Sequence, residues 1–264
     1  MTRNFKNFHL KIQKIKIQEK WKFPLFLSSG VVVIIFLILS LMGVSYPPKE
    51  VQIANITDSS LSISWITDKP TNGGVVLSSQ PNRFWRTLEF FACQYLLRCR
   101  VFGDEIVNPS VSHFVVLKNL KPETAYYYRI YSAGKLWKKD KEGRILPKIK
   151  TSGVLETLSL PNPIYSQVLE VDGKRPIAGA LVHISLVEGK DRIVKSKPLI
   201  TYTDSKGIWL ADLGNLRDET DENRAISPSF DDLLFISVLT PDGRKVGRFA
   251  EIYQKRTVEP IVVQ

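Results

Sequence analysis

The stretch Leu61-Ser62-Ile63-Ser64-Trp65 alternates strictly between apolar and polar residues. Successive side chains of a β-strand point to opposite faces, so this alternation predicts a strand with one buried face. Similar short runs occur along the chain beyond residue 47, and turn-forming residues such as Asn72-Gly73-Gly74 and Lys121-Pro122 separate them. Many short strands at this spacing predict an antiparallel β-sandwich.

The second half of the chain repeats this pattern. Five further strands are predicted at Ile164–Val171, Ala180–Val187, Leu199–Thr203, Leu233–Leu239 and Val246–Ile252. Small residues and two prolines between positions 152 and 163 indicate a domain boundary. We therefore expect a mainly β chain with two tandem Ig-like sandwiches, at 47–152 and 153–264, each near the ~100 residues typical of such a fold.

Residues 25–46 contain no charged side chain. As an α-helix, a segment of this length would extend about 33 Å, which matches the hydrocarbon core of a bilayer. A buried core helix would have a polar face, and this segment has none. We therefore predict a transmembrane helix at 24–46. Gly43 and Ser45 have the spacing of a signal-peptidase site, but the length of the apolar run favours an uncleaved anchor over a cleaved signal.

The net charge of +11 is concentrated before this apolar segment. Residues 1–23 contain seven lysines and arginines and a single acidic residue, Glu19. Nucleic-acid binding is one explanation for a basic segment. The cations end where the apolar run starts, however, and the positive-inside rule accounts for them without a ligand. We predict a cytoplasmic tail at 1–23, a single crossing of the lipid bilayer, extracytoplasmic C-terminal domains and no nucleic-acid partner.

Residues 81–100 interrupt the first predicted sandwich, and we expect a loop or a short helix there. Its aromatic residues form either an exposed binding patch or a cover over an open sheet edge. These residues are Phe84, Trp85, Phe90, Phe91 and Tyr95. The chain's two cysteines, Cys93 and Cys99, lie in the same insert, and on the extracytoplasmic side such a pair could close a small disulfide loop.

Residues 120–128 (LKPETAYYY) resemble the Leu-x-Pro-x-Thr-x-Tyr signature of the fibronectin type III domain. The resemblance covers roughly residues 48–151. It implies that Tyr126 closes a tyrosine corner by bonding back to nearby backbone, and that Trp65 is the core tryptophan of the second strand. Residues 71–77 (TNGGVVL) resemble the purple-acid-phosphatase N-terminal variant of this domain, which precedes some metallophosphatase domains. The insert at 81–100 departs from the family pattern.

Two motifs of the second half resemble carboxypeptidase-regulatory or Cna-B-type sandwiches. They are the opening 171–182 (VDGKRPIAGALV) and the hairpin 203–209 (TDSKGIW). Some members of that family form a Lys–Asn isopeptide bond between edge strands. The strand predicted at 164–171 contains no lysine, so we do not expect this crosslink.

The sequence contains no nucleophile elbow, zinc-protease motif or phosphate-binding glycine loop. His113 and His183 fall within apolar strands and are expected to be sheet residues. The acidic run at 218–222 lacks the spacing of a calcium-binding loop. We therefore expect no catalytic residue, no metal site and no cofactor.

These features favour a non-enzymatic, membrane-anchored surface protein at the cell membrane. Its sandwiches would act as a stalk or as an adhesion module that binds extracellular protein or polysaccharide. The alternative is an accessory subunit that positions or presents an exported hydrolase. Both expectations rest on analogy, because sandwich folds host many functions.

Overall fold

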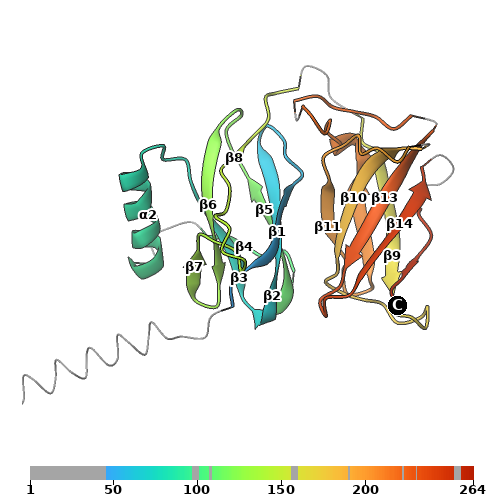
Figure 1. The fold of residues 1–264 in the computed structure, drawn as a ribbon, viewed down its shortest axis with the longest axis horizontal. Helices are drawn as coiled ribbons and strands as arrows, with labels where there is room; N and C mark the ends of the chain where they lie inside the picture. Colours follow the sequence, from blue (N-terminus) through green and yellow to red (C-terminus); the bar gives the residue numbers. More distant parts are fainter. Residues whose placement is uncertain are drawn as a thin grey trace, which may run out of the picture. The chain divides into compact units, whose positions relative to one another are not determined.

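The structure of the chain is a computed structural model. It describes residues 46–96, 101–106, 109–155, 160–189, 191–221, 223–229, 231–252 and 257–264. The predicted cytoplasmic tail at 1–23 and the predicted transmembrane helix, up to residue 45, lie outside these residues. Within the described ranges, no helix is long and apolar enough to cross a membrane. Tyr46–Gln264 forms one compact unit that is mainly β, as predicted (Figure 1).

The first part of this unit contains two β-sheets that share one core. One sheet has the order β1-β2-β5, with bounds Lys49–Ala54, Ser60–Thr71 and Ser110–Lys118. The other has the order β4-β3-β6-β7, with bounds Val101–Gly103, Gly73–Ser78, Ala125–Ser132 and Lys135–Trp137. A short strand β8, Ile149–Lys150, also pairs with β6. All of these pairs are antiparallel.

Strand β2 shows why the alternating stretch is informative. Leu61, Ile63 and Trp65 are buried between the two sheets. Ser62 and Ser64 point to the other face, as the period of two requires, and yet both are buried as well. That face of the sheet is covered by the second part of the chain, which the polar pattern of the strand did not indicate.

The second part also consists of two sheets around one core. One has the order β11-β10-β13-β14, with bounds Leu199–Tyr202, Leu181–Glu188, Asp232–Leu239 and Lys245–Glu251. The other has the order β12-β9-β15, with bounds Ile208–Asp212, Pro163–Leu169 and Ile261–Val262. A 3₁₀ turn, η2 at Leu213–Asn215, follows β12. We expected a purely antiparallel sandwich. Strand β15 pairs with β9 in parallel, so this expectation was wrong for one pair of strands.

The insert forms helix α2, Arg83–Leu96, one of the two expected alternatives. Asn82 begins it as an N-cap, because its side-chain oxygen accepts a hydrogen bond from the Phe84 backbone N–H at 2.9 Å. The inner side of α2 packs on β3 through Phe90, Cys93 and Val76. The helix therefore covers the outer face of the β4-β3-β6-β7 sheet.

The second sandwich covers the opposite side of the first. An apolar cluster joins the β1-β2-β5 sheet to strands β10, β11 and β13, and it contains Ala54, Ile66, Ile106, Phe114, Leu181, Ile200 and Leu239. Helix α2 and the second sandwich thus lie on opposite faces of the first sandwich (Figure 1).

Candidate functional site

The outer side of α2 carries a continuous apolar surface, which we call the aromatic face. Its residues are Phe84, Trp85, Leu88, Phe91 and Tyr95, and each is between 43% and 63% exposed. The spacing of three and four residues places them along one side of the helix. Two ring pairs lie within it, Phe84 with Trp85 at 5.3 Å and Phe91 with Tyr95 at 4.6 Å between centroids.

Phe90 differs from the other predicted patch residues. Its side chain is only 3% exposed and lies under the helix, where the Arg129 guanidinium stacks on its ring at 4.4 Å. The predicted patch is therefore divided between both proposed roles, since Phe90 covers the sheet while the other four aromatics face solvent. Leu88 belongs to the same face by its helical spacing, a signal that the pattern of aromatic residues does not include.

Side chains at both ends fix the position of α2. Near its C-terminal end, the Gln94 amide donates to the Gly134 carbonyl at 3.1 Å and accepts from the Leu136 N–H at 2.6 Å. Towards its start, Arg86 stacks over the Tyr127 ring at 3.6 Å. The aromatic face is thus presented by a helix held on a rigid sheet.

Cys93 lies on the buried side of α2 and is disulfide-bonded. Cys99, the other cysteine of the chain, lies outside the described residues. The pairing of Cys93 with Cys99 therefore stays a prediction.

His113 lies at the centre of a cluster of polar side chains inside the first sandwich. Its Nδ1 lies 2.5 Å from Asp104 Oδ2, and its ring stacks on Trp65 at 4.8 Å with an interplanar angle of 14°. Its Nε2 lies 3.3 Å from the hydroxyls of both Thr67 and Thr71. Carboxylate, imidazole and hydroxyl are the groups of an acyl-transfer site. Here, however, the Asp104 and His113 side chains are fully buried, so no substrate can reach them.

Gly73 is required by this buried pair. A β-carbon at position 73 would lie 2.3 Å from His113 Nδ1 and 2.8 Å from Asp104 Oδ2, far inside van der Waals contact. The glycine of the 71–77 motif therefore allows strand β3 to approach the imidazole. The motif was visible in the sequence, but Asp104 was not recognised because it lies in an irregular segment after β4.

Tyr126 and Trp65 occupy interior positions of the first sandwich. Tyr126 is buried, and its hydroxyl oxygen accepts a hydrogen bond from the Lys121 backbone N–H at 2.9 Å. This bond closes the turn that leads into β6. Trp65 is fully buried in the core between the sheets.

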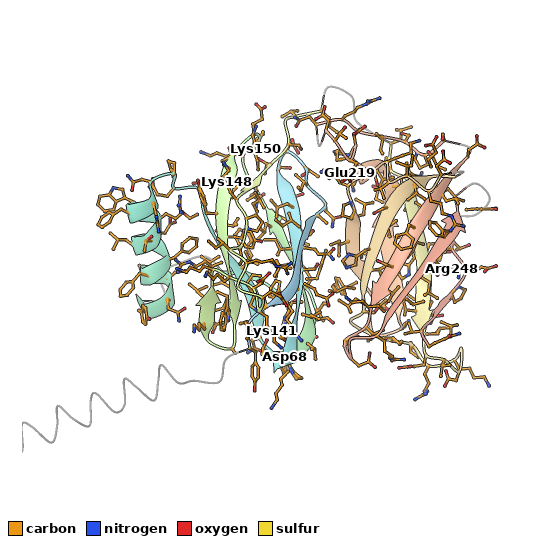
Figure 2. The ribbon with its side chains drawn as sticks, in the orientation of Figure 1. Asp68, Lys141, Lys148, Lys150, Glu219 and Arg248 are labelled. Carbon is orange, nitrogen blue, oxygen red and sulfur yellow. The ribbon has the colours of Figure 1, made fainter. Side chains whose placement is uncertain are left out.

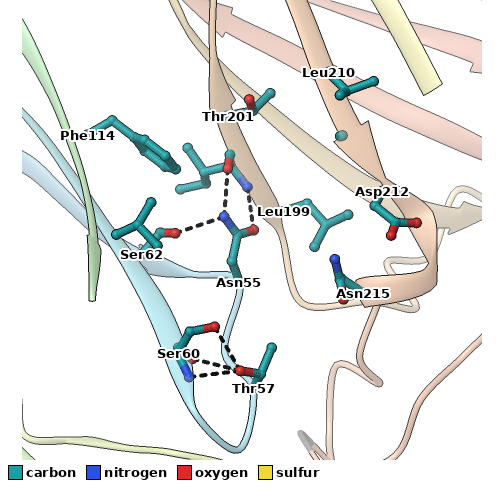
Figure 3. A pocket seen from close by; sticks show the side chains of 13 residues that line it. Asn55, Thr57, Ser60, Ser62, Phe114, Leu199, Thr201, Leu210, Asp212 and Asn215 are labelled. Atoms are coloured by element: carbon teal, nitrogen blue, oxygen red, sulfur yellow. Dashed lines mark hydrogen bonds between the residues drawn. The ribbon is translucent and has the colours of Figure 1, made fainter. Parts of the chain in front are cut away.

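Asn55 joins the two sandwiches. Its amide donates to the Ile200 carbonyl at 2.7 Å and accepts from the Ile200 N–H at 3.0 Å (Figure 3). The side chain thus satisfies both backbone groups of Ile200, as a neighbouring strand would. Its left-handed backbone, with φ of 52°, directs the chain out of β1 at this point.

A pocket of about 320 Å³ opens beside Asn55. Figure 3 shows it between the end of β1 and the strands of the second sandwich. Its polar lining comes mainly from Asn55, Thr57, Ser60, Thr201, Asp212 and Asn215. These residues are scattered along the sequence, and sequence reasoning identified none of them.

His183 lies near the same junction and interacts electrostatically with Glu50 and Lys245, which form an ion pair at 2.6 Å. Burial lowers the pKa of His183 to about 4, because the protonated ring would lose its hydration. Its Nε2 has no hydrogen-bond partner among the described residues. His183 is therefore neutral at pH 7 and has no paired acid to make it a general base.

Charged side chains elsewhere serve local structure. Asp68 binds both Lys49 and Lys141, and these two ammonium groups lower the pKa of its carboxyl group (Figure 2). In the acidic run, Asp218 accepts from the Thr220 N–H and hydroxyl, and Asp221 accepts from the Asn223 N–H. Within the described ranges, no group of three or more His, Cys, Asp or Glu residues could hold a metal ion.

Comparison with known families finds one match, which lies in the first sandwich. Residues 48–142 match the purple acid phosphatase N-terminal domain. This agrees with the resemblance of the 71–77 run and covers less than half of the chain. No curated protein matches the sequence.

Three solved structures illustrate the wider likeness. The central fibronectin-III array of RIM-binding protein has 14% identity and a TM-score of 0.23, covering 79% of this chain and 64% of that one. Chicken CNTN1 FN1–FN3 has 10% identity and a TM-score of 0.24, covering 79% and 66%. BcpA, the major pilin subunit of Bacillus cereus, has 12% identity and a TM-score of 0.23, covering 82% and 71%.

The chain spans slightly less than two thirds of the length of the first two of these structures, 64% and 66%. At TM-scores this low the likeness carries no functional argument.

Proposed function

We propose that this chain is a non-enzymatic, membrane-anchored surface protein whose two extracytoplasmic sandwiches form a stiff stalk or binding module. Its ligand would be an extracellular protein or polysaccharide. The second sandwich would be of the carboxypeptidase-regulatory or Cna-B type, on the motifs at 171–182 and 203–209.

The junction between the sandwiches is the observation that carries this proposal. Tandem domains usually move relative to one another unless a large apolar interface restrains them. Here, apolar residues of both sandwiches pack together, and Asn55 binds both backbone groups of the buried Ile200. The Lys245–Glu50 ion pair bridges the same junction at its surface. These contacts support a spacer of fixed length rather than two domains on a flexible linker.

The absence of enzymatic activity is proposed from the two histidines of the described sheets. Asp104 and His113 are sealed in the interior, where no substrate can reach them. His183 has no hydrogen-bond partner for Nε2 among the described residues and is held neutral by burial. General acid–base catalysis needs a group within hydrogen-bond reach of the substrate. Neither histidine meets this condition.

An accessory role beside an exported hydrolase is the second candidate. The specific observation in its favour is the match of residues 48–142 to an N-terminal domain of a phosphatase. In the accessory role, the sandwich would be supplied by one chain and the catalytic domain by another. The stiff junction would then set the position of that catalytic subunit.

A single purification distinguishes these functions. The full chain carrying a C-terminal tag is extracted from membranes in mild detergent, and the eluate is analysed for copurifying proteins and bound polysaccharide. The stalk or adhesion function predicts retained polysaccharide or surface protein and no phosphatase, peptidase or glycosidase turnover. A stoichiometric hydrolase in the eluate would support the accessory role. Turnover by the chain itself, abolished by His113→Ala, would contradict both.

A further inference from the structure

The aromatic face of α2 has no covering element within the described part of the chain. Four aromatic rings and Leu88 are exposed over three helical turns, although Phe90 on the opposite side is buried against the sheet. Exposed apolar patches of this kind mark interaction sites. Trp and Tyr rings are favoured where one edge is apolar and the other is wet, as at the headgroup level of a bilayer.

The position of α2 relative to the start of the described chain points to a particular partner. Gln94 binds the backbone of Gly134 and Leu136, in the hairpin between β6 and β7. Ser132, in the same hairpin, donates its hydroxyl to the Tyr46 carbonyl at 3.1 Å. The C-terminal end of α2 and Tyr46 therefore meet at one hairpin. Tyr46 is also the last residue of the apolar segment predicted to cross the membrane.

The same end of the sandwich is rich in cations. Lys69, Lys135, Lys138 and Lys139 are exposed and form no ion pair with a described carboxylate. The Lys69 ammonium lies 5.9 Å from the centre of the Tyr46 ring. The Lys141 N–H donates to the Pro48 carbonyl at 2.8 Å, which holds the 138–141 segment beside the start of the unit.

Nearby carboxylates do not cancel this charge. Asp68 is shared between Lys49 and Lys141, and Arg144 is shared between Asp140 and Glu142, so these three carboxylates are matched by three cations. An apolar face flanked by unpaired lysines, next to a predicted membrane segment, complements a bilayer that contains anionic phospholipid.

We propose that the aromatic face of α2 docks onto the surface of an anionic phospholipid bilayer, the one that holds the N-terminal anchor. Since α2 and the second sandwich cover opposite faces of the first, docking would leave the second sandwich farthest from the membrane. The stalk would then be fixed in direction as well as in length. This inference rests on the proposed membrane anchoring and adds a second contact with the same bilayer.

The test uses the full chain reconstituted in vesicles of phosphatidylcholine and phosphatidylglycerol with brominated acyl chains, which quench tryptophan fluorescence. The difference between the unsubstituted chain and Trp85→Phe isolates the Trp85 signal from the other four tryptophans. Strong quenching of this signal is expected in anionic vesicles. Vesicles of phosphatidylcholine alone should quench it several-fold less, because they lack the anionic headgroups that attract the exposed lysines.

Matched variants test the surface itself. Leu88→Ser should reduce the quenching of Trp85, whereas Leu210→Ser, at an equally apolar exposed position on the second sandwich, should leave it unchanged. Replacing Lys69, Lys135, Lys138 and Lys139 by Gln should reproduce the result seen in phosphatidylcholine.

Unquenched Trp85 in anionic vesicles would overturn the proposal. Protection of α2 from protease only when anionic polysaccharide is added would also overturn it, because the face would then bind a polymer. Protection that appears only as the protein-to-lipid ratio rises would assign the face to a second copy of the chain. Extraction of the chain by alkaline carbonate would instead show that the membrane anchoring has failed. An anchored chain with unquenched Trp85 refutes this inference alone.

Discussion

The two sandwiches stabilise their interiors differently. In the first, Asp104, His113, Thr67 and Thr71 form a buried hydrogen-bonded cluster beside Trp65. In the second, Trp209 belongs to an apolar cluster that extends through strands of both sheets. Around its core tryptophan, the first interior thus depends on hydrogen bonds between side chains, whereas the second depends on apolar packing, with buried hydroxyls such as that of Thr203 bonded to backbone groups.

The two histidines of the described sheets show the same contrast on a smaller scale. His113 has a carboxylate partner and two hydroxyl neighbours. The His183 Nε2 has none among the described residues, and burial lowers its pKa to about 4. A change at the first site therefore removes a partner, whereas a change of pH adds an uncompensated charge at the second.

The largest effect is expected for Asp104→Ala. It leaves the buried His113 imidazole and the Phe114 N–H without their acceptor, and each unpaired group should lower the free energy of unfolding by about 1–3 kcal/mol. Asp68→Ala is the control, because Asp68 binds its two lysines at the surface and should contribute less than about 1 kcal/mol. Urea unfolding of residues 46–264 measures both. Equal effects would mean that the buried pair does not determine the stability of the first sandwich.

His183 should make the free energy of unfolding depend on pH. The expected change is about 3 kcal/mol at most, which corresponds to a pKa lowered from 6.5 to about 4. Above pH 6.5 the ring is neutral in both states and contributes nothing. As pH falls from 6.5 towards 4, the unfolded chain binds the proton more readily, and stability is lost. Urea unfolding at pH 7 and at pH 4.5 should show a smaller loss for His183→Leu than for the unsubstituted chain. Identical losses would rule out His183 as the cause.

Asn55→Ala should have an intermediate effect at the junction. It leaves the buried N–H and carbonyl of Ile200 unpaired, at a cost of about 1–3 kcal/mol. Spin labels at Lys118→Cys and Lys206→Cys, one on each sandwich, should give a single narrow distance distribution. Asn55→Ala should broaden it, whereas Lys245→Ala, which removes only a surface ion pair, should not. A broad distribution in the labelled parent would refute a stiff stalk.

The smallest effect on overall stability is expected from the Cys93→Ser, Cys99→Ser double variant. The predicted loop is short, so the bridge should stabilise the fold by less than about 3 kcal/mol. The variant should remain folded and become protease-sensitive between Pro81 and Val101. Unchanged protease resistance of this segment would show that the contacts of Arg86, Phe90 and Gln94 fix α2 without the bridge.

Local patterns in the sequence predicted the strands well. The predicted strands at 164–171, 180–187, 199–203, 233–239 and 246–252 correspond to β9, β10, β11, β13 and β14, with ends that differ by at most two residues. Alternation is a property of neighbouring residues, so it can be recognised without knowing what the strand packs against.

Features that depend on distant residues were not predicted. Asn55 binds Ile200, and Asp104 binds His113, although no repeating pattern in the sequence relates either pair. The inward position of Phe90 follows from the rotation of α2 on its sheet. Strand β15 completes a sheet by parallel pairing with β9, which no local signal indicates.

Membrane topology provides the decisive test of the whole account. The full chain with a tag after Gln264 is produced in bacterial cells, the outer layers are removed, and a protease that cannot cross the membrane is added. We predict that the tag and both sandwiches are digested while the membrane is intact. A tag that remains protected until the membrane is permeabilised would place the sandwiches on the cytoplasmic side and contradict the proposed surface function.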